Sequence, residues 1–152
     1  MLLMASFGSN KVKLTEGTNF GNLAPVELLQ GIIIEDNKYL LINFWAASNP
    51  QSRIENLKLN HLLSSPENSH IQLVSISLDN SEAVFKGVVQ ADQLNESTHF
   101  YLSQDLKKKF EDSFYSNDNL SNWLINKEGM IISKNLSMEE ILKTIQDSKS
   151  KI

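Results

Sequence analysis

The chain has 152 residues, of which 41% are hydrophobic and 21% charged, and this composition suits one globular domain with a single core. Its net charge of −4 disfavours nucleic acid and anionic membranes as partners. No apolar run approaches the roughly 20 residues of a membrane-spanning helix. The absence of cysteine excludes disulfides, a thiolate nucleophile and cysteine metal sites.

The N-terminal part of the sequence shows weak hydrophobic patterning. We expect an N-terminal arm over residues 1–18, followed by one domain over residues 19–152. The opening MLLMASF lacks a positively charged start and is too short for a secretory signal, so no complete signal peptide is expected in this chain. Two short extended segments are predicted at residues 24–29 and 32–34, with a turn at Gly31 between them.

Residues 39–46, YLLINFWA, form a near-continuous apolar run, which is typical of a central strand covered on both faces. Ser48 or Asn49 can cap a following helix that has Pro50 in its first turn, and the sequence SSP at residues 64–66 ends it. The core-facing stripe of this helix is predicted to consist of Ile54, Leu57, Leu62 and Leu63.

The next part of the chain repeats the order of strand and helix. Residues 71–78, IQLVSISL, alternate apolar and polar side chains and are predicted to form a second strand. Residues 79–81, DNS, offer caps for a helix, and a short strand at 98–102 and a helix at 103–114 follow. The apolar residues of these two helices are Val84, Phe85, Val88 and Val89 in the first, and Leu106, Phe110 and Phe114 in the second.

The C-terminal part is predicted to form a hairpin and a helix. Residues 122–125 and 130–134 read as two strands joined by a polar loop that ends in glycine. The sequence SMEE at residues 137–140 is a capping box, and the helix after it carries apolar residues on one side, Ile141, Leu142 and Ile145. The alternation of strand and helix patterns favours the α/β class.

Residues 39–53, YLLINFWAASNPQSR, combine a strand end, a turn and a helix start. The corresponding run in thioredoxin-like proteins is Phe-Trp-Ala-x-x-Cys-x-x-Cys-Arg, and this chain resembles it with both cysteines replaced. Asn49 and Ser52 occupy the two cysteine positions. The matching residues are Phe44, Trp45, Ala46 and Arg53, with Glu55 matching the longer pattern of one branch of the family.

Two further segments support this resemblance: LVSISLD at residues 73–79 and LINKEGMII at residues 124–132. In this order they resemble the TlpA-like thiol-disulfide oxidoreductases of bacterial cell envelopes and, more distantly, the AhpC/TSA-like peroxiredoxins. The resemblance covers about residues 20–147. It implies a thioredoxin-like fold, in which a central mixed β-sheet is flanked by helices on both faces, here with an N-terminal extension.

The sequence departs from the family at the positions that carry its chemistry. The first cysteine of the family attacks a disulfide as a thiolate, whereas Asn49 cannot ionise and Ser52 has no evident histidine partner. Leu120 stands where the family places a cis-proline that shapes the substrate groove, and we expect a trans peptide bond there. Asn43 stands where thioredoxin keeps a buried aspartate, although asparagine is common there in the TlpA-like branch.

Two classes of function follow. In the first, the chain is a redox-inactive binding module for a polypeptide or a small ligand. The predicted groove would be lined by Trp45, Ser48, Asn49, Pro50, Tyr115, Leu120 and Trp123. In the second, the chain is an enzyme of the thiol-disulfide oxidoreductase family with altered chemistry, in which Asn49 or Ser52 stabilises an anionic group at the helix start.

The simplest roles of these residues are structural. We favour core packing for Phe44 and Trp45 over ligand contact, and helix capping for Asn49 and Ser52 over catalysis. Arg53 and Glu55 are predicted to form a solvated or partner-facing pair. The three histidines lack metal-ligand spacing, so we expect no metal and no cofactor. A periplasmic or envelope location follows from the resemblance alone.

Overall fold

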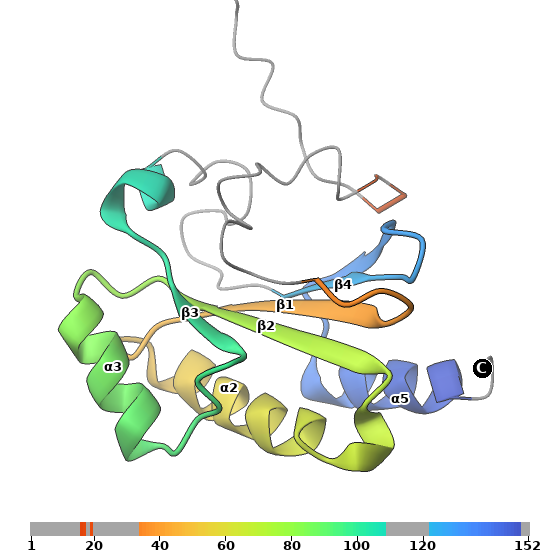
Figure 1. Ribbon diagram of the computed structural model, residues 1–152, viewed down its shortest axis with the longest axis horizontal. Helices are drawn as coiled ribbons and strands as arrows, with labels where there is room; N and C mark the ends of the chain where they lie inside the picture. The colour runs from red at the N-terminus through yellow and green to blue at the C-terminus, as the bar shows by residue number, and fades with distance from the viewer. Residues whose placement is uncertain (1–15, 18, 20–33, 109–121, 150–152) are drawn as a thin grey trace, which may run out of the picture.

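The computed structural model describes residues 16–17, 19, 34–108 and 122–149. A five-stranded mixed sheet with strand order β3-β2-β1-β4-β5 forms its centre (Figure 1). The central strand β1 runs parallel to β2, which runs parallel to β3, whereas β4 is antiparallel to β1 and β5 to β4. The strands are β1 (Tyr39–Trp45), β2 (Ile71–Ser77), β3 (His99–Tyr101), β4 (Asn122–Ile125) and β5 (Ile131–Lys134).

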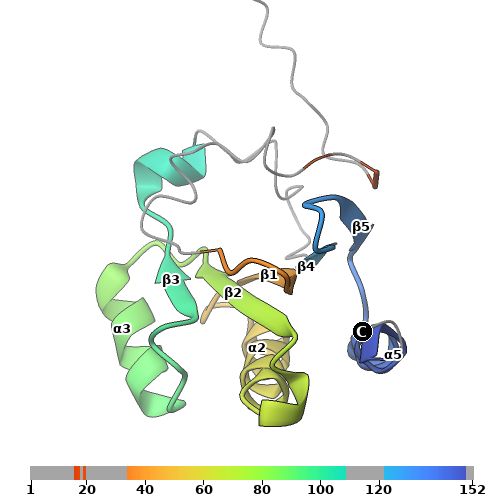
Figure 2. The same cartoon turned by 45° about the vertical axis from the view of Figure 1, so that its right-hand side comes forward.

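Helices cover both faces of the sheet. Figures 1 and 2 show α2 (Pro50–Leu63), α3 (Glu82–Ala91) and α5 (Met138–Lys149) on one face, and the helical residues 104–108 on the other. A short 3-10 turn, η1 (Pro66–Asn68), follows α2. Successive side chains along each strand point to opposite faces of the sheet, so the core has a layer on each side. This arrangement confirms the predicted fold class.

The core layers follow from the alternation along β1. Leu41 packs with Leu59 of α2 and Ile141 of α5 beneath the sheet, whereas Leu40 and Ile42 belong to a cluster on the opposite face. A third cluster lies under α3 and contains Trp45, Phe85, Val88, Val89 and Leu94. The near-continuous apolar run of β1 is therefore explained by its central position, because both of its faces are covered.

The chain itself pairs with the start of β5 on its outer edge. The Gly17 N–H donates to the Ile131 carbonyl at 2.8 Å, and Asn19 forms an isolated antiparallel bridge with Met130. The division between an arm and a domain near residue 18 stays a prediction. The expected extended segments at residues 24–29 and 32–33 lie outside the described residues, as does the part of the expected helix after residue 108.

The helix starts agree with the caps expected from the sequence. Asn49 is the N-cap of α2, and Ser81 is the N-cap of α3, accepting a hydrogen bond from the Val84 N–H at 3.3 Å. In the capping box of α5, the Ser137 N–H donates to the Glu140 carboxylate at 2.7 Å, and the Glu140 N–H donates to the Ser137 hydroxyl at 3.2 Å. These side chains satisfy backbone donors that an isolated helix leaves unpaired.

The predicted core-facing stripe of α2 is wrong for its N-terminal half. Ile54 is 49% exposed and Leu57 is 42% exposed, whereas Ser52, Asn56 and Leu59 are the buried residues of this helix. Apolar periodicity pointed to the wrong face because the inner face carries polar side chains that bond to other buried polar groups. Leu62 and Leu63 are half-buried and pack against the cluster beneath the sheet, as predicted.

No helix in the described part of the chain combines the length and the apolar character that crossing a bilayer requires.

Candidate functional site

The start of α2 directly follows β1 and carries Asn49 and Ser52, the two positions at which the family that the sequence resembles has cysteines. Asn49 is exposed and has an extended backbone, with φ −110° and ψ 99°. Its side-chain oxygen accepts a hydrogen bond from the Ser52 N–H at 3.0 Å, and Pro50 occupies the first helical turn. Asn49 therefore has the capping role predicted for it.

Ser52 is buried and ties the helix start to the strand end. Its hydroxyl oxygen accepts from the Ala46 N–H at 3.1 Å and lies 2.9 Å from the Asn49 carbonyl, to which it can donate. The Ala46 carbonyl is a second acceptor, at 3.2 Å. In the described residues no histidine or carboxylate contacts this hydroxyl. The Ser52 hydroxyl thus links the backbone groups of Ala46 and Asn49 by hydrogen bonds, at a position where the resembled family has a cysteine sulfur.

The backbone donors around this helix start are almost all in use. Asp79 is buried, and its carboxylate accepts from the Ala47 N–H at 2.8 Å and the Ser48 N–H at 3.4 Å. The Arg53 N–H donates to the Asn49 carbonyl at 3.1 Å. Within the described residues, Gln51 offers the one N–H of the first turn without a partner. The site therefore has little capacity to hold an anion, although helix N-termini are otherwise suited to it.

A buried lysine fixes the segment that carries Asp79. The Lys107 ammonium donates to the carbonyl oxygens of Leu78 and Asp79 and lies 3.4 Å from the Asn80 side-chain oxygen. Burial lowers the pKa of Lys107, and the nearby Asp79 charge acts in the opposite direction. The sequence offered Asp79 as a helix cap for α3, but the structure uses it to hold the loop after β1. No sequence signal singles out Lys107.

A chain of buried polar side chains lies beneath α2. The Asn43 amide donates to the Asn56 side-chain oxygen at 3.1 Å, and the Ser75 hydroxyl donates to the same oxygen. The Asn56 amide nitrogen lies 3.0 Å from His99 Nε2, and His99 Nδ1 lies 2.9 Å from the Asn95 carbonyl. These contacts assign the proton of the neutral imidazole to Nδ1 and leave Nε2 as the acceptor. All four side chains of this polar chain are buried.

The predicted pair of Arg53 and Glu55 is wrong. Arg53 instead forms two hydrogen bonds with the carboxylate of Asp92, at 2.7 and 2.6 Å, and so links α2 to the end of α3. Glu55 accepts from the Gln51 side chain at 2.9 Å, one turn earlier in α2. The bond to Arg53 is the main reason why the pKa of Asp92 is lowered. A partner 39 residues away has no local sequence signal.

The structure separates the residues of the predicted groove. Trp45 is fully buried under α3, and Trp123 is buried in the cluster on the opposite face of the sheet. Their burial agrees with the preferred core role of Trp45. The exposed members at the helix start are Ser48, Asn49 and Pro50. Tyr115 and Leu120 lie outside the described residues, so their place in a groove and the trans peptide bond at Leu120 stay predictions. Within the part of the chain that is described, no cluster of histidine and acidic residues could hold a metal ion.

A solved structure of a thioredoxin-like protein from Parabacteroides distasonis matches this chain with 33% sequence identity and a TM-score of 0.61. The match covers 88% of this chain and 99% of that one. The chain belongs to the thioredoxin-like family. The predicted family resemblance is thereby confirmed, and the replaced cysteine positions fall at the start of α2 in this thioredoxin-like domain.

More distant structures share the thioredoxin-like fold. The thioredoxin domain of a thiol-disulfide oxidoreductase from Bacteroides vulgatus is 22% identical, with a TM-score of 0.62 over 74% of this chain and 80% of that one. A thiol:disulfide interchange protein from a Bacteroides species is 23% identical, with a TM-score of 0.60 over 73% and 72% of the two chains. No family profile and no curated protein sequence matches this thioredoxin-like chain.

The buried histidine makes the stability of the thioredoxin-like domain depend on pH. Burial lowers the pKa of His99 below its usual value near 6.5, whereas the hydrogen bond to the Asn95 carbonyl acts in the opposite direction. The unfolded chain therefore takes up a proton at a higher pH than the folded chain. The contribution of His99 to stability is fully present above about pH 6.5 and is lost as the pH falls through that value towards the folded pKa.

We expect the melting temperature to fall as the pH is lowered from about 8 to about 5. The free energy of unfolding should fall by up to roughly 1.4 kcal/mol for each unit by which the His99 pKa differs between the folded and unfolded states. The variant His99→Gln should melt with a weaker dependence over the same range, because an amide does not titrate. Differential scanning calorimetry of both proteins measures this. An equally steep dependence in the variant would assign the effect to other groups.

Proposed function

We propose that this thioredoxin-like chain is a redox-inactive binding module of the bacterial envelope, which recognises a polypeptide or a small ligand without exchanging disulfides. The observation that carries this proposal is the replacement of both cysteine positions by Asn49 and Ser52 in a chain with no other cysteine. Disulfide exchange requires a thiolate that attacks and a second thiol that resolves the mixed disulfide. Neither group exists in this chain.

The bonding of the two replaced positions supports a structural role for them rather than a new chemistry. The Asn49 side-chain oxygen caps the helix, and the Ser52 hydroxyl is engaged by backbone groups of Ala46 and Asn49. A serine nucleophile needs a base within hydrogen-bond reach, and the only histidine in the nearby polar chain, His99, contacts Asn56 and Asn95 instead. The enzymatic alternative therefore has no catalytic group in its favour among the described residues.

The binding role draws on the rigidity of the region. Asp79 holds the loop after β1 and Lys107 holds the segment that carries Asp79, so the exposed residues 48–50 are presented on a fixed backbone. A preorganised surface loses little conformational entropy when a partner binds. The envelope location rests on the family resemblance, and cell fractionation with an antibody against this chain tests it.

The redox assignment is tested by insulin reduction. The purified chain, with dithiothreitol as the reductant, should precipitate insulin no faster than dithiothreitol alone, because no protein thiol relays the electrons. An active thioredoxin assayed in parallel serves as the positive control. A rate above the dithiothreitol background would overturn the redox-inactive assignment.

Introducing cysteines at the two replaced positions should allow a disulfide to form but should not give the full disulfide-exchange activity of a thioredoxin. In the double variant Asn49→Cys/Ser52→Cys, we expect the free energy of unfolding to stay within about 2 kcal/mol of the parent, since the lost cap and hydroxyl bonds are each worth about 1 kcal/mol. Activity should remain low because Leu120 replaces the family's cis-proline.

Thiol titration, thermal melts and the insulin assay of this double variant measure the three expectations. The single variant Ser52→Cys is the matched control, because it adds one thiol at the buried position without a partner for a disulfide. A double variant as active as a thioredoxin would show that the residue at position 120 has little influence on the groove.

A further inference from the structure

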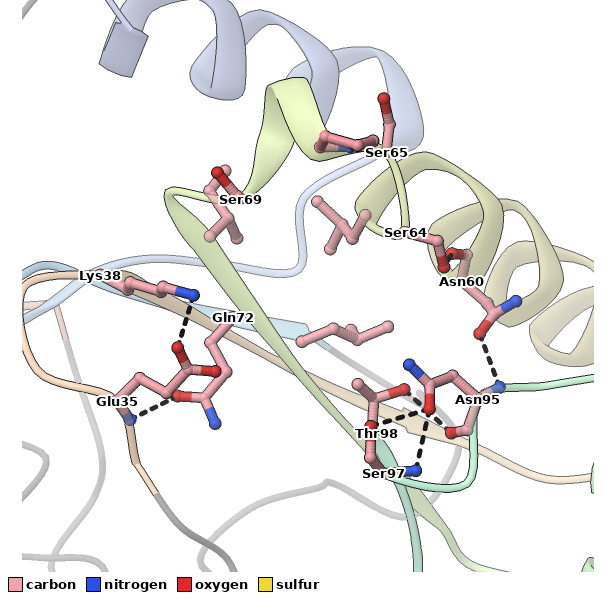
Figure 3. A pocket seen from close by; sticks show the side chains of 14 residues that line it. Glu35, Lys38, Asn60, Ser64, Ser65, Ser69, Gln72, Asn95, Ser97 and Thr98 are labelled. Carbon is pink, nitrogen blue, oxygen red and sulfur yellow. Dashed lines mark hydrogen bonds and ion pairs between the residues drawn. The ribbon is translucent and has the colours of Figure 1, made fainter.

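A polar pocket of about 270 Å³ lies at the far end of α2 from Asn49 (Figure 3). Because α2 has 14 residues, this end is about 21 Å from Asn49. The pocket is formed where β2 begins, between the end of α2 and the turn before β3. Figure 3 shows Glu35, Lys38 and Gln72 on one side of β2 and Asn60, Asn95 and Thr98 on the other.

The first residues of β2 leave main-chain groups open at this pocket. The seven residues of β2 pair with β1 along their whole length, but β3 pairs only with residues 75–77. The Ser75 N–H donates to the Thr98 carbonyl at 2.8 Å, which shows that Ser75 directs its backbone groups to the β3 side. Alternation along the strand directs those of Ile71 and Leu73 to the same side. Nothing in the described residues pairs with them, and both residues line the pocket.

The side chains around this open strip offer further hydrogen-bonding groups and no net charge. The Asn60 side-chain oxygen accepts from the Asn95 N–H at 3.0 Å, while the amide nitrogens of Asn60 and Asn95 have no partner among the described residues. The charges of Lys38 and Glu35 cancel in an ion pair of 2.5 Å. Leu63 of α2 adds an apolar wall. The pocket therefore matches an uncharged group that carries amide donors and acceptors at strand spacing.

We propose that this pocket binds a short extended, uncharged segment of a partner polypeptide, whose main chain pairs with Ile71 and Leu73 and so continues the sheet where β3 ends. Strand addition is an established way of recognising extended peptides, in which main-chain bonds supply affinity and neighbouring pockets supply selectivity. The proposal deepens the binding-module function and rests on it, because it places the polypeptide site at the end of α2.

The two edges of the sheet differ in a way that fits this proposal. At β5, the chain's own Gly17 donates to the Ile131 carbonyl and so pairs with the first residue of that edge. At the start of β2, the open strip contains only Ile71 and Leu73, and it ends at Thr98, where pairing with β3 begins. A strip as short as this can accept one peptide segment but is a poor template for long sheet-to-sheet association.

The proposal is tested by selecting short random peptides displayed on phage against the full chain, and by measuring synthetic copies of the selected peptides. Ser69 is exposed and lines the pocket, and its hydroxyl has no partner in the described residues. The variant Ser69→Trp fills the pocket and should raise the Kd of the selected peptides roughly tenfold or more. The control Ala83→Trp, at an exposed position of α3 away from the pocket, should leave the Kd within about twofold.

A second measurement uses the unmodified chain. On addition of a selected peptide, the amide resonances of Ile71 and Leu73 should shift in NMR spectra, and their hydrogen exchange should slow. A third variant, Ser48→Trp, crowds the start of α2. Recovery of no binding peptide would overturn the proposal. Peptides weakened by Ser48→Trp but not by Ser69→Trp would also overturn it, while leaving the binding-module function in place at the other end of α2. The redox assignment is tested separately by insulin reduction.

Discussion

Replacing Trp45 by alanine is expected to lower the free energy of unfolding by about 3 to 5 kcal/mol. The Trp45 ring is fully buried. Its centroid lies 6.4 Å from that of the Phe85 ring and 6.1 Å from that of the His99 ring, which it meets edge to face. Its indole N–H is buried and has no hydrogen-bond partner among the described residues, so the loss is expected to come from packing. For a domain of this size, the melting temperature should fall by roughly 6 to 20 °C.

Two further variants make the test of Trp45 specific. Trp45→Phe keeps an aromatic ring in the cluster and should cost less than the alanine variant. Ile54→Ala removes an apolar side chain that is 49% exposed on α2 and should change stability by no more than about 0.5 kcal/mol. Urea unfolding of the three proteins gives the comparison. A small effect of Trp45→Ala would contradict the core role and would favour an exposed platform for a ligand.

Replacing Asn56 by alanine is expected to have an effect of similar size, about 3 to 5 kcal/mol, although the residue is polar. Asn56 is fully buried and bonds to three other buried side chains, Asn43, Ser75 and His99. Each partner left without a hydrogen bond in the interior costs about 1 to 3 kcal/mol. Denaturant unfolding, monitored by tryptophan fluorescence, measures the loss.

The matched control for Asn56 lies on the outer face of the same helix. Lys58→Ala changes an exposed residue of α2 and should leave stability within about 0.5 kcal/mol. The double variant Asn56→Ala/Ser75→Ala removes one of the orphaned hydroxyls together with its partner, and its loss should be smaller than the sum of the two single losses. Strict additivity would mean that the two side chains do not act as a pair.

Most of the fold could be predicted from the sequence because its signals are local. The apolar run of β1, the alternation in β2 and the capping box at Ser137 each specify an element through its own residues. The motif around Trp45 then identified the thioredoxin-like arrangement. Pro50 and Asn49 marked the helix start because capping and proline placement depend on neighbours in the chain.

The remaining features depend on contacts that the sequence does not display. Asn56 is buried because it meets Asn43, Ser75 and His99, which come from three different strands, and apolar periodicity pointed instead to Ile54. The bond between Arg53 and Asp92 joins two helices. Polar side chains of this kind carry no pattern of their own, so their burial becomes visible only when the elements are assembled.

The hydrogen bonds that Ser52 makes with Ala46 and Asn49 have a consequence for how this corner of the chain forms during folding. In relatives with two cysteines, the covalent state of this corner depends on an oxidant or a reductant. Here the same corner closes by hydrogen bonds that form as the backbone folds. The chain should therefore reach the same final state in glutathione-rich and in oxidising surroundings, and its thermal midpoint should be indifferent to added reductant.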